Sequence, residues 1–194
     1  MMHMHGRSAC YDARPVAPYL SAPLHNTQAV ITNPMMRSIT AVLHTQNDAL
    51  RLGRALETLY PCDEILVVDH GSDDRTTQIA REYGARIFTE KEGASPGDYL
   101  RLAEAEWVLC LDPRESLTES LAASLFEWKT EPLAPGTGAF SIFLREETID
   151  GWVENPVAQT RLVPYNWGQW EGRLPGHHSS GTVLEGELLH FVFP

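Results

Sequence analysis

The sequence predicts an α/β fold with a mostly parallel central sheet flanked by helices. Short apolar runs such as Ile65 to Val68 and Trp107 to Leu111 are uninterrupted, which is typical of parallel strands covered on both faces. Segments with helical periodicity lie between these runs. Because strands that alternate with helices of this length form right-handed βαβ units, we expect a Rossmann-like arrangement.

The first strand is expected over residues 38–43, where β-branched and apolar side chains alternate with few interruptions. A polar turn, His44 to Asp48, offers good helix-capping residues. The helix that follows is expected to bury one apolar side, which consists of Leu50, Ala55, Leu56 and Leu59.

The remaining elements follow from the same signals. Gly84 is expected to end a helix over residues 76–83, because glycine is the usual residue just past a helix end. Ser116 and Glu119 match a capping box that would open a helix at Leu117. The other expected elements are strands over residues 65–68, 86–88 and 107–111 and helices over residues 98–105 and 117–128.

Composition narrows the class of protein. The 194 residues are 43% hydrophobic and carry a formal net charge of −11, so a nucleic-acid backbone is an unfavourable partner. No apolar run approaches the roughly 20 residues that span a bilayer, although peripheral membrane association stays open. Three cysteines without metal-ligand spacing favour a reducing, cytoplasmic protein. The proline-containing residues 1–36 are expected to be a flexible arm, and residues 37–194 a single domain.

Acids follow two of the predicted strands. Asp69 ends the run that begins at Ile65, and Asp112 ends the run that begins at Trp107. The carboxyl edge of an open α/β sheet is where ligands bind, so these side chains and the hydroxyl, amide and carboxylate groups of Thr45, Asn47 and Asp48 indicate a nucleoside pocket. For Asp69 alone, a purely helix-capping role is the alternative.

The loop after Asp69 supports this interpretation. Gly71 allows a tight backbone turn, and Ser72 or Asp73 can cap the helix that begins near Arg75. A carboxylate held in such a loop suits hydrogen bonding to a base or a ribose.

Several further segments carry a family resemblance. In these segments the chain resembles the family 2 glycosyltransferases with the glycosyltransferase A-type fold, in particular the branch that adds glucose or related sugars to the lipopolysaccharide core. The resemblance extends over residues 38–194. Its motifs are Thr45 to Asp48 (TQND), Val67 to Thr76 (VVDHGSDDRT), Gly97 to Leu100 (GDYL), Trp107 to Asp112 (WVLCLD), Arg161-Leu162, Trp170 to Arg173 (WEGR) and Leu188 to Phe191 (LLHF).

The resemblance implies an inverting transfer of a sugar from a nucleotide-diphosphate sugar donor to a glycan or lipid-linked acceptor, in the synthesis of cell-envelope polysaccharide. It implies a nucleotide site that consists of Thr45, Asn47, Asp48, Asp69, Gly71, Ser72 and Asp112. In the family a divalent cation, Mg²⁺ or Mn²⁺, usually binds at the second acid of the motif around Asp112. Here that position is Arg114.

Arg114 at this position allows three interpretations. A guanidinium repels a hard cation but can itself hold a diphosphate, which would make the reaction metal-independent. Alternatively Arg114 is a solvated residue paired with Glu115 or Glu119, or Asp112 and Glu115 bind the metal.

The family's His-Glu pair, whose carboxylate suits deprotonation of the acceptor, aligns with Pro175-Gly176. Glu171 and His177 are therefore the candidate bases. The alternative function is a catalytically degenerate relative that binds a nucleotide sugar or serves in assembly.

Overall fold

The computed structural model describes residues 36–179 and 181–193. The predicted N-terminal arm, residues 1–36, lies outside the described residues except for Met36, which is exposed. Cys10 also lies outside them. None of the helices in the described part of the chain has the length and apolar character that crossing a bilayer requires.

Strands and helices alternate in the order that the sequence predicts as far as β4, and the unpredicted strand β5 precedes α4. In chain order they are β1 (Ile39–Thr45), α1 (Ala49–Glu57), β2 (Glu64–Asp69), α2 (Thr76–Glu82), β3 (Arg86–Thr89), α3 (Pro96–Leu100), β4 (Trp107–Leu111), β5 (Glu115–Leu117), α4 (Glu119–Thr130), β6 (Phe140–Thr148), β7 (Gly151–Glu154), β8 (Gln159–Pro164), β9 (Trp170–Glu171), β10 (Leu174–Pro175) and β11 (Thr182–His190).

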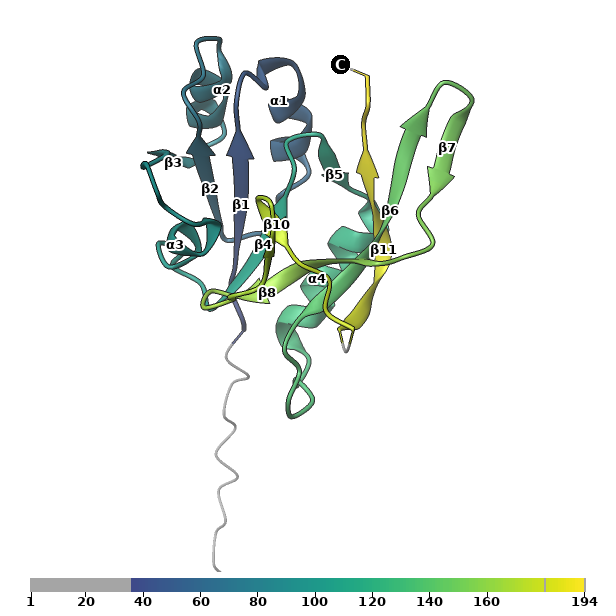
Figure 1. Ribbon diagram of the computed structural model, residues 1–194. Coiled ribbons are helices and arrows are strands. Elements are labelled where there is room, and N and C mark those ends of the chain that lie inside the picture. The colour runs from purple at the N-terminus through teal and green to yellow at the C-terminus, as the bar shows by residue number, and fades with distance from the viewer. Residues whose placement is uncertain (1–35, 180, 194) are drawn as a thin grey trace, which may run out of the picture. The chain divides into compact units, whose positions relative to one another are not determined.

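One sheet runs through these elements in the order β3-β2-β1-β4-β8-β6-β11-β5, with β7 beside β6 (Figure 1). The strands β3, β2, β1 and β4 are parallel to one another, which confirms the predicted Rossmann-like α/β fold. The second half is mixed, since β8 is antiparallel to β4 and β6, whereas β11 is parallel to β6. The hairpin of β9 and β10 is a separate two-stranded sheet.

Two apolar layers cover the sheet. On one face, α1, α2 and α4 pack through Leu52, Ala80 and Leu125 against odd-numbered residues of β1 and β4. On the other face, Tyr99 and Leu100 of α3 pack against even-numbered residues of the same strands. The β9–β10 hairpin joins this second layer through its partly buried apolar side chains. Because side chains alternate between the two faces of a strand, the odd-numbered residues of β1 and β4 face one layer and the even-numbered residues face the other.

Three local expectations were wrong. Leu50 is exposed, and Leu52 takes the buried position in α1, because Leu52 precedes Ala55, Leu56 and Leu59 by three, four and seven residues and so shares their side of the helix. The third helix is short and ends at Leu100. The predicted capping box at Ser116 does not open α4, since residues 115–117 form β5 and Thr118 caps the helix with its side chain.

Candidate functional site

The strand-end residues named from the sequence lie at one edge of the parallel half of the sheet. Thr45 and Asp69 are the last residues of β1 and β2 and are directly paired. Asp112 follows β4, the neighbour of β1 on its other side. This edge is the carboxyl end of the parallel strands, where ligands bind in open α/β sheets.

The two loops after β1 and β2 are bonded to each other. The Asn47 backbone N–H donates to Ser72 Oγ at 2.9 Å, and the Asp73 N–H donates to Asn47 Oδ1 at 2.9 Å. The Asp48 N–H donates to Thr76 Oγ1 at 2.8 Å. The polar groups of Asn47 and Ser72 that were expected to bind a nucleotide therefore join the loops and fix the shape of the edge.

The backbone of these loops is also specialised. Among the residues that the structure describes, Asn47 is the one non-glycine residue with a positive φ, at 56°. Asparagine tolerates this left-handed conformation better than most residues do. Gly71 has a φ of 81° and faces open space, so the turn after Asp69 needs its backbone freedom and not its small volume.

Two buried oxygens at this edge lack a partner within the described residues. Asp69 is 6% exposed; its Oδ2 accepts a hydrogen bond from the Ser72 N–H at 3.1 Å, whereas its Oδ1 accepts none. Thr45 Oγ1, on the residue paired with Asp69, is likewise unpartnered. Leaving a buried polar group unpaired costs about 1–3 kcal/mol. The two atoms are therefore available to a polar ligand or to water.

Arg114 covers the acid of β4. Its backbone N–H and its Nε both approach Asp112 Oδ1, at 2.9 and 3.1 Å. The sequence expectation that Arg114 pairs with Glu115 or Glu119 was wrong, because the tight turn after Asp112 folds the guanidinium back onto that residue. The Arg114 side chain is 45% exposed, so its other nitrogens can reach a ligand.

Glu115 lies inside the molecule. It is 1% exposed, and its Oε1 accepts from Arg161 Nη2 at 2.9 Å while its Oε2 accepts from the Asp112 N–H at 3.0 Å. Both oxygens are thus engaged, and Asp112 Oδ1 is held by Arg114. The residues present do not fit the expected Mg²⁺ or Mn²⁺ ion, and no group of three or more potential ligands exists among the described residues. That Asp112 and Glu115 bind a metal stays a prediction, and the engagement of both Glu115 oxygens within the protein argues against it.

The two candidate bases lie in the C-terminal part of the domain. Glu171 is exposed on β9, and its residue pairs with Leu174 across the hairpin. His177 is exposed and lines a shallow hollow with residues of β6, including Ser141. No hydrogen bond or ion pair among the described residues connects Glu171 or His177 to Asp69 or Asp112. Their catalytic roles stay predictions.

The sequence analysis missed a pair of histidines at the same edge. His44 on β1 is 8% exposed, and its Nδ1 lies 2.9 Å from Nε2 of His70, which follows β2. The His44 ring also meets the Tyr99 ring edge to face at 5.7 Å. Burial is the main reason that the pKa of His44 is lowered to about 4. The signal was present, since His44 and His70 each stand next to a predicted site residue.

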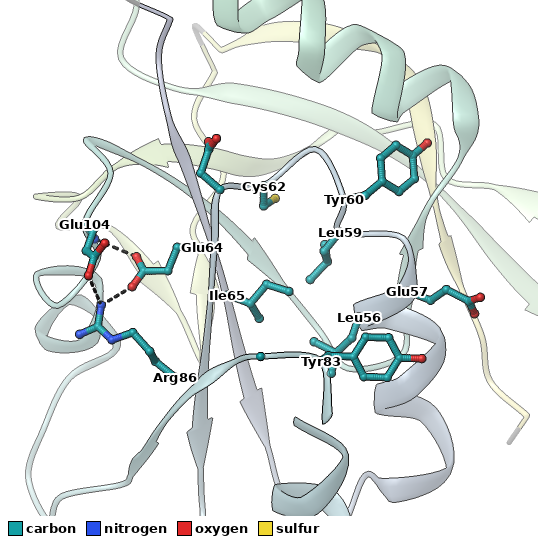
Figure 2. Close-up of a pocket in the computed structure, with 12 residues that line it drawn as sticks. Leu56, Glu57, Leu59, Tyr60, Cys62, Glu64, Ile65, Tyr83, Arg86 and Glu104 are labelled. Carbon is teal, nitrogen blue, oxygen red and sulfur yellow. Dashed lines mark hydrogen bonds and ion pairs between the residues drawn. The ribbon is translucent and has the colours of Figure 1, made fainter. Parts of the chain in front are cut away.

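A hollow of about 520 Å³ lies at the opposite, amino end of β2 and β3 (Figure 2). Glu64 in this hollow is paired with Arg86, which also contacts Glu104 at 3.3 Å. Cys62 also lines the hollow and is partly buried, and desolvation of its thiol raises the pKa to about 12. Because carboxylates outnumber Arg86 around this hollow, it is unsuited to a diphosphate. The strand-end edge is therefore the better candidate site.

Comparisons with known proteins agree in part with the family resemblance. No family model matches the chain. A TPR repeat-containing protein of Synechococcus elongatus is 31% identical over 123 residues, which are 61% of this chain and 30% of that protein. An uncharacterized glycosyltransferase of Rickettsia felis is 32% identical over 90 residues, which are 44% of this chain and 32% of that protein. The chain spans about a third of the length of these curated relatives.

Solved structures were also compared. A glucosyl-3-phosphoglycerate synthase of Mycobacterium tuberculosis has a TM-score of 0.46 and 18% identity, with 68% of this chain and 57% of that chain covered. A mannosyl-3-phosphoglycerate synthase of Rubrobacter xylanophilus has a TM-score of 0.42 and 26% identity, with 57% and 39% covered. In sequence, the chain is similar over part of its length to proteins named as glycosyltransferases.

Proposed function

We propose that this chain is a glycosyltransferase of the A-type fold that transfers a sugar, with inversion, from a nucleotide-diphosphate sugar to a glycan or lipid-linked acceptor. The observation that carries the proposal is the pair of buried, unpartnered oxygens of Asp69 and Thr45 at the carboxyl edge of the parallel strands. The segments that resemble family 2 glycosyltransferases and the relatives that bear this name support it.

In this proposal each group at the edge has a role that follows from its chemistry. Asp69 Oδ1 and Thr45 Oγ1 take the hydrogen-bond donors of the nucleoside. Asp112 takes a hydroxyl of the ribose or donor sugar through Oδ2, which makes no hydrogen bond within the described residues. The exposed nitrogens of Arg114 take the diphosphate, whose negative charge grows as the bond to the sugar breaks.

The acceptor hydroxyl would attack the anomeric carbon from the face opposite the diphosphate. Its proton would pass to Glu171 or His177, which belong to the segment after β8 that includes the β9–β10 hairpin. No step of this scheme runs through a metal ion. Cys62, which is partly buried, and Cys110, which is buried, are free thiols, and this agrees with a reducing, cytoplasmic setting.

Binding of uridine diphosphate tests the pocket. Asp69→Asn keeps the shape and the bond to the Ser72 N–H but removes the charge and one acceptor, so we expect binding to weaken by about 1.5–3 kcal/mol. Asp73→Asn is the matched control, because Asp73 is exposed in the same loop and its side chain makes no hydrogen bond within the described residues. Calorimetric titration gives the affinities, and thermal unfolding with ligand gives a second measure. Equal affinity of parent and Asp69→Asn would show that the pocket is misassigned.

The second candidate function is a nucleotide-sugar-binding or assembly module without catalysis. Two observations favour it: Arg114 covers Asp112, and Pro175-Gly176 stands where the family has its base. Release of uridine diphosphate from a panel of uridine-diphosphate sugars, measured with glycan and lipid-linked acceptors, separates the two. Binding without any release supports the module, and release that requires an acceptor supports the transferase.

A further inference from the structure

Three ionisable side chains, those of His44, His70 and Glu90, contact one another in series at the carboxyl edge of the sheet. His44 Nδ1 lies 2.9 Å from His70 Nε2, and His70 Nδ1 lies 2.7 Å from Glu90 Oε2. The Glu90 oxygen lies off the direction in which the ring N–H points, so this last contact is electrostatic. The outer nitrogen of the chain, His44 Nε2, is buried and has no partner within the described residues.

The state of His70 decides what His44 presents to a ligand. If His70 is neutral with its proton on Nδ1 beside Glu90, its Nε2 accepts from His44 Nδ1–H, and His44 Nε2 is a bare lone pair. If His70 carries an extra proton, its Nε2–H donates to His44 Nδ1. The proton of neutral His44 then lies on Nε2, which becomes a donor. One proton on His70 therefore converts His44 Nε2 from an acceptor into a donor.

The surrounding groups disfavour a proton on His44 itself. The charged groups that act on His44 are His70, Glu90 after β3 and Arg173 in the β9–β10 turn, and Tyr99 of α3 packs against its ring. Burial, His70 and Arg173 lower the pKa of His44, whereas Glu90 raises it less. The carboxylate of Glu90 lies against His70 Nδ1, at 2.7 Å.

We propose that His44 and His70 form a proton-linked site for an anionic oxygen of the bound nucleotide, in which His44 Nε2–H donates to the oxygen while His70 holds the added proton beside Glu90. The ligand class rests on the proposed function, which supplies a nucleoside diphosphate. Arg173 adds a second positive charge near His44, and an anion is the ligand that both groups favour. Binding of the diphosphate then draws one proton from solvent onto the histidine pair.

Two substitutions at His44 separate the two ends of its ring. His44→Gln carries an amide near the position of Nε2, so it can donate to the ligand at any pH but has no link to His70. His44→Asn carries its amide near the position of Nδ1, so it keeps the link to His70 but has no group that reaches the ligand. Thermal unfolding at pH 7.5 establishes that each variant is folded before binding is measured.

The experiment is calorimetric titration with uridine diphosphate between pH 6 and 8, in buffers of different ionisation enthalpy. On binding, the parent should take up as much as one proton more than His44→Gln. As the pH rises, the affinity of the parent should therefore fall by up to about tenfold per pH unit relative to that variant. Ionisation of the ligand itself is common to both and cancels. His44→Asn should bind about tenfold to a hundredfold more weakly than the parent. Uridine, which lacks phosphate, should show no proton uptake.

A ligand-independent measurement accompanies the titration. The ¹⁵N shifts of the histidine rings in the free protein should show His44 with its proton on Nε2 when His70 is charged, and on Nδ1 when it is neutral. Equal proton uptake in the parent and His44→Gln would overturn the inference and leave the proposed function intact. Failure of the parent to bind either uridine or uridine diphosphate would instead overturn the proposed function, and the ligand assigned here with it.

Discussion

At the scale of single residues, Arg114 occupies one oxygen of the acid that follows β4. Its Nε approaches an oxygen of Asp112 that a divalent cation would otherwise use, and its exposed side chain brings a fixed positive charge to the end of β4. A fixed guanidinium and a hard cation are alternative ways to neutralise a diphosphate. Substitution of Arg114 therefore tests which of the two, the guanidinium or a cation, neutralises the diphosphate at this site.

We predict that binding of uridine diphosphate to the parent is nearly independent of manganese and weakens as salt screens the exposed charge. Arg114→Ala should weaken binding at every manganese concentration. Arg114→Asp should weaken metal-free binding and also create a response to manganese, because it adds a carboxylate beside Asp112. Arg101→Ala is the control, since Arg101 is exposed and paired only with Asp98 on the same turn. Tight binding by the parent only with manganese would contradict the role of Arg114.

The lowered pKa of His44 predicts how the free energy of unfolding depends on pH. Its pKa is about 4 in the folded protein, against about 6.5 for an unperturbed histidine, so the unfolded chain binds more protons between these values. The contribution of His44 to stability is complete above pH 6.5 and is lost as the pH falls toward 4. It amounts to about 3 kcal/mol at most. Urea unfolding at pH 7 and 4.5 should show a smaller loss for His44→Gln than for the parent, and equal losses would contradict the lowered pKa.

At the scale of elements, the start of α4 depends on a single side chain. Thr118 Oγ1 accepts from the Leu121 N–H at 3.2 Å and also donates to the Glu187 carbonyl oxygen at 3.0 Å. It thereby caps the helix and attaches it to β11. Ser116, the cap expected from the sequence, is one residue inside β5 and makes only a long contact of 3.4 Å to the Arg54 carbonyl oxygen.

Single substitutions of Thr118 and Ser116 distinguish the contributions of the two side chains to stability. Thr118→Ala should lower the free energy of unfolding by about 1–2 kcal/mol, because a helix cap and a bond to β11 are lost together. Ser116→Ala should have a smaller effect, and Thr130→Ala, at the exposed end of α4, provides the baseline. Urea unfolding of the three variants measures the order. A larger effect of Ser116→Ala than of Thr118→Ala would support Ser116, and not Thr118, as the residue that caps α4.

At the scale of the whole domain, a buried ion pair joins β5, the last strand in the order of the sheet, to β8, which lies beside β4. Glu115 of β5 and Arg161 of β8 are both almost fully buried and lie 2.9 Å apart. Glu115 also accepts the backbone N–H of Asp112, so the pair supports the turn that carries the candidate site. A buried pair of this kind is costly to break on one side only.

We predict that Arg161→Leu lowers the free energy of unfolding by about 3–5 kcal/mol, because it leaves the Glu115 charge buried without its partner. Glu115→Gln combined with Arg161→Leu should recover part of the loss. A double-mutant cycle by urea unfolding measures the coupling. Additive effects of the two changes would show that Glu115 and Arg161 do not act as a unit.

Much of the parallel half of the fold could be predicted, because its determinants are local. Uninterrupted apolar runs specify strands such as β4, which matches residues 107–111, and Gly84 ends α2 with a φ of 75°. Asp69 and Asp112 could be placed at one edge because the carboxyl ends of parallel strands coincide. These are properties of short windows and of chain topology.

The sequence by itself therefore determined the α/β class, the strand-end acids and the glycine and asparagine turns beside them. Only the tertiary structure decided how the acids are used: Arg114 rests on Asp112, Arg161 from β8 engages Glu115, and Asp69 keeps one oxygen unpaired. It also brought His44 and His70 together, 26 residues apart in the chain. The physical reason is that hydrogen-bond partners and burial depend on strand register and long-range packing, and no local pattern of residues encodes them.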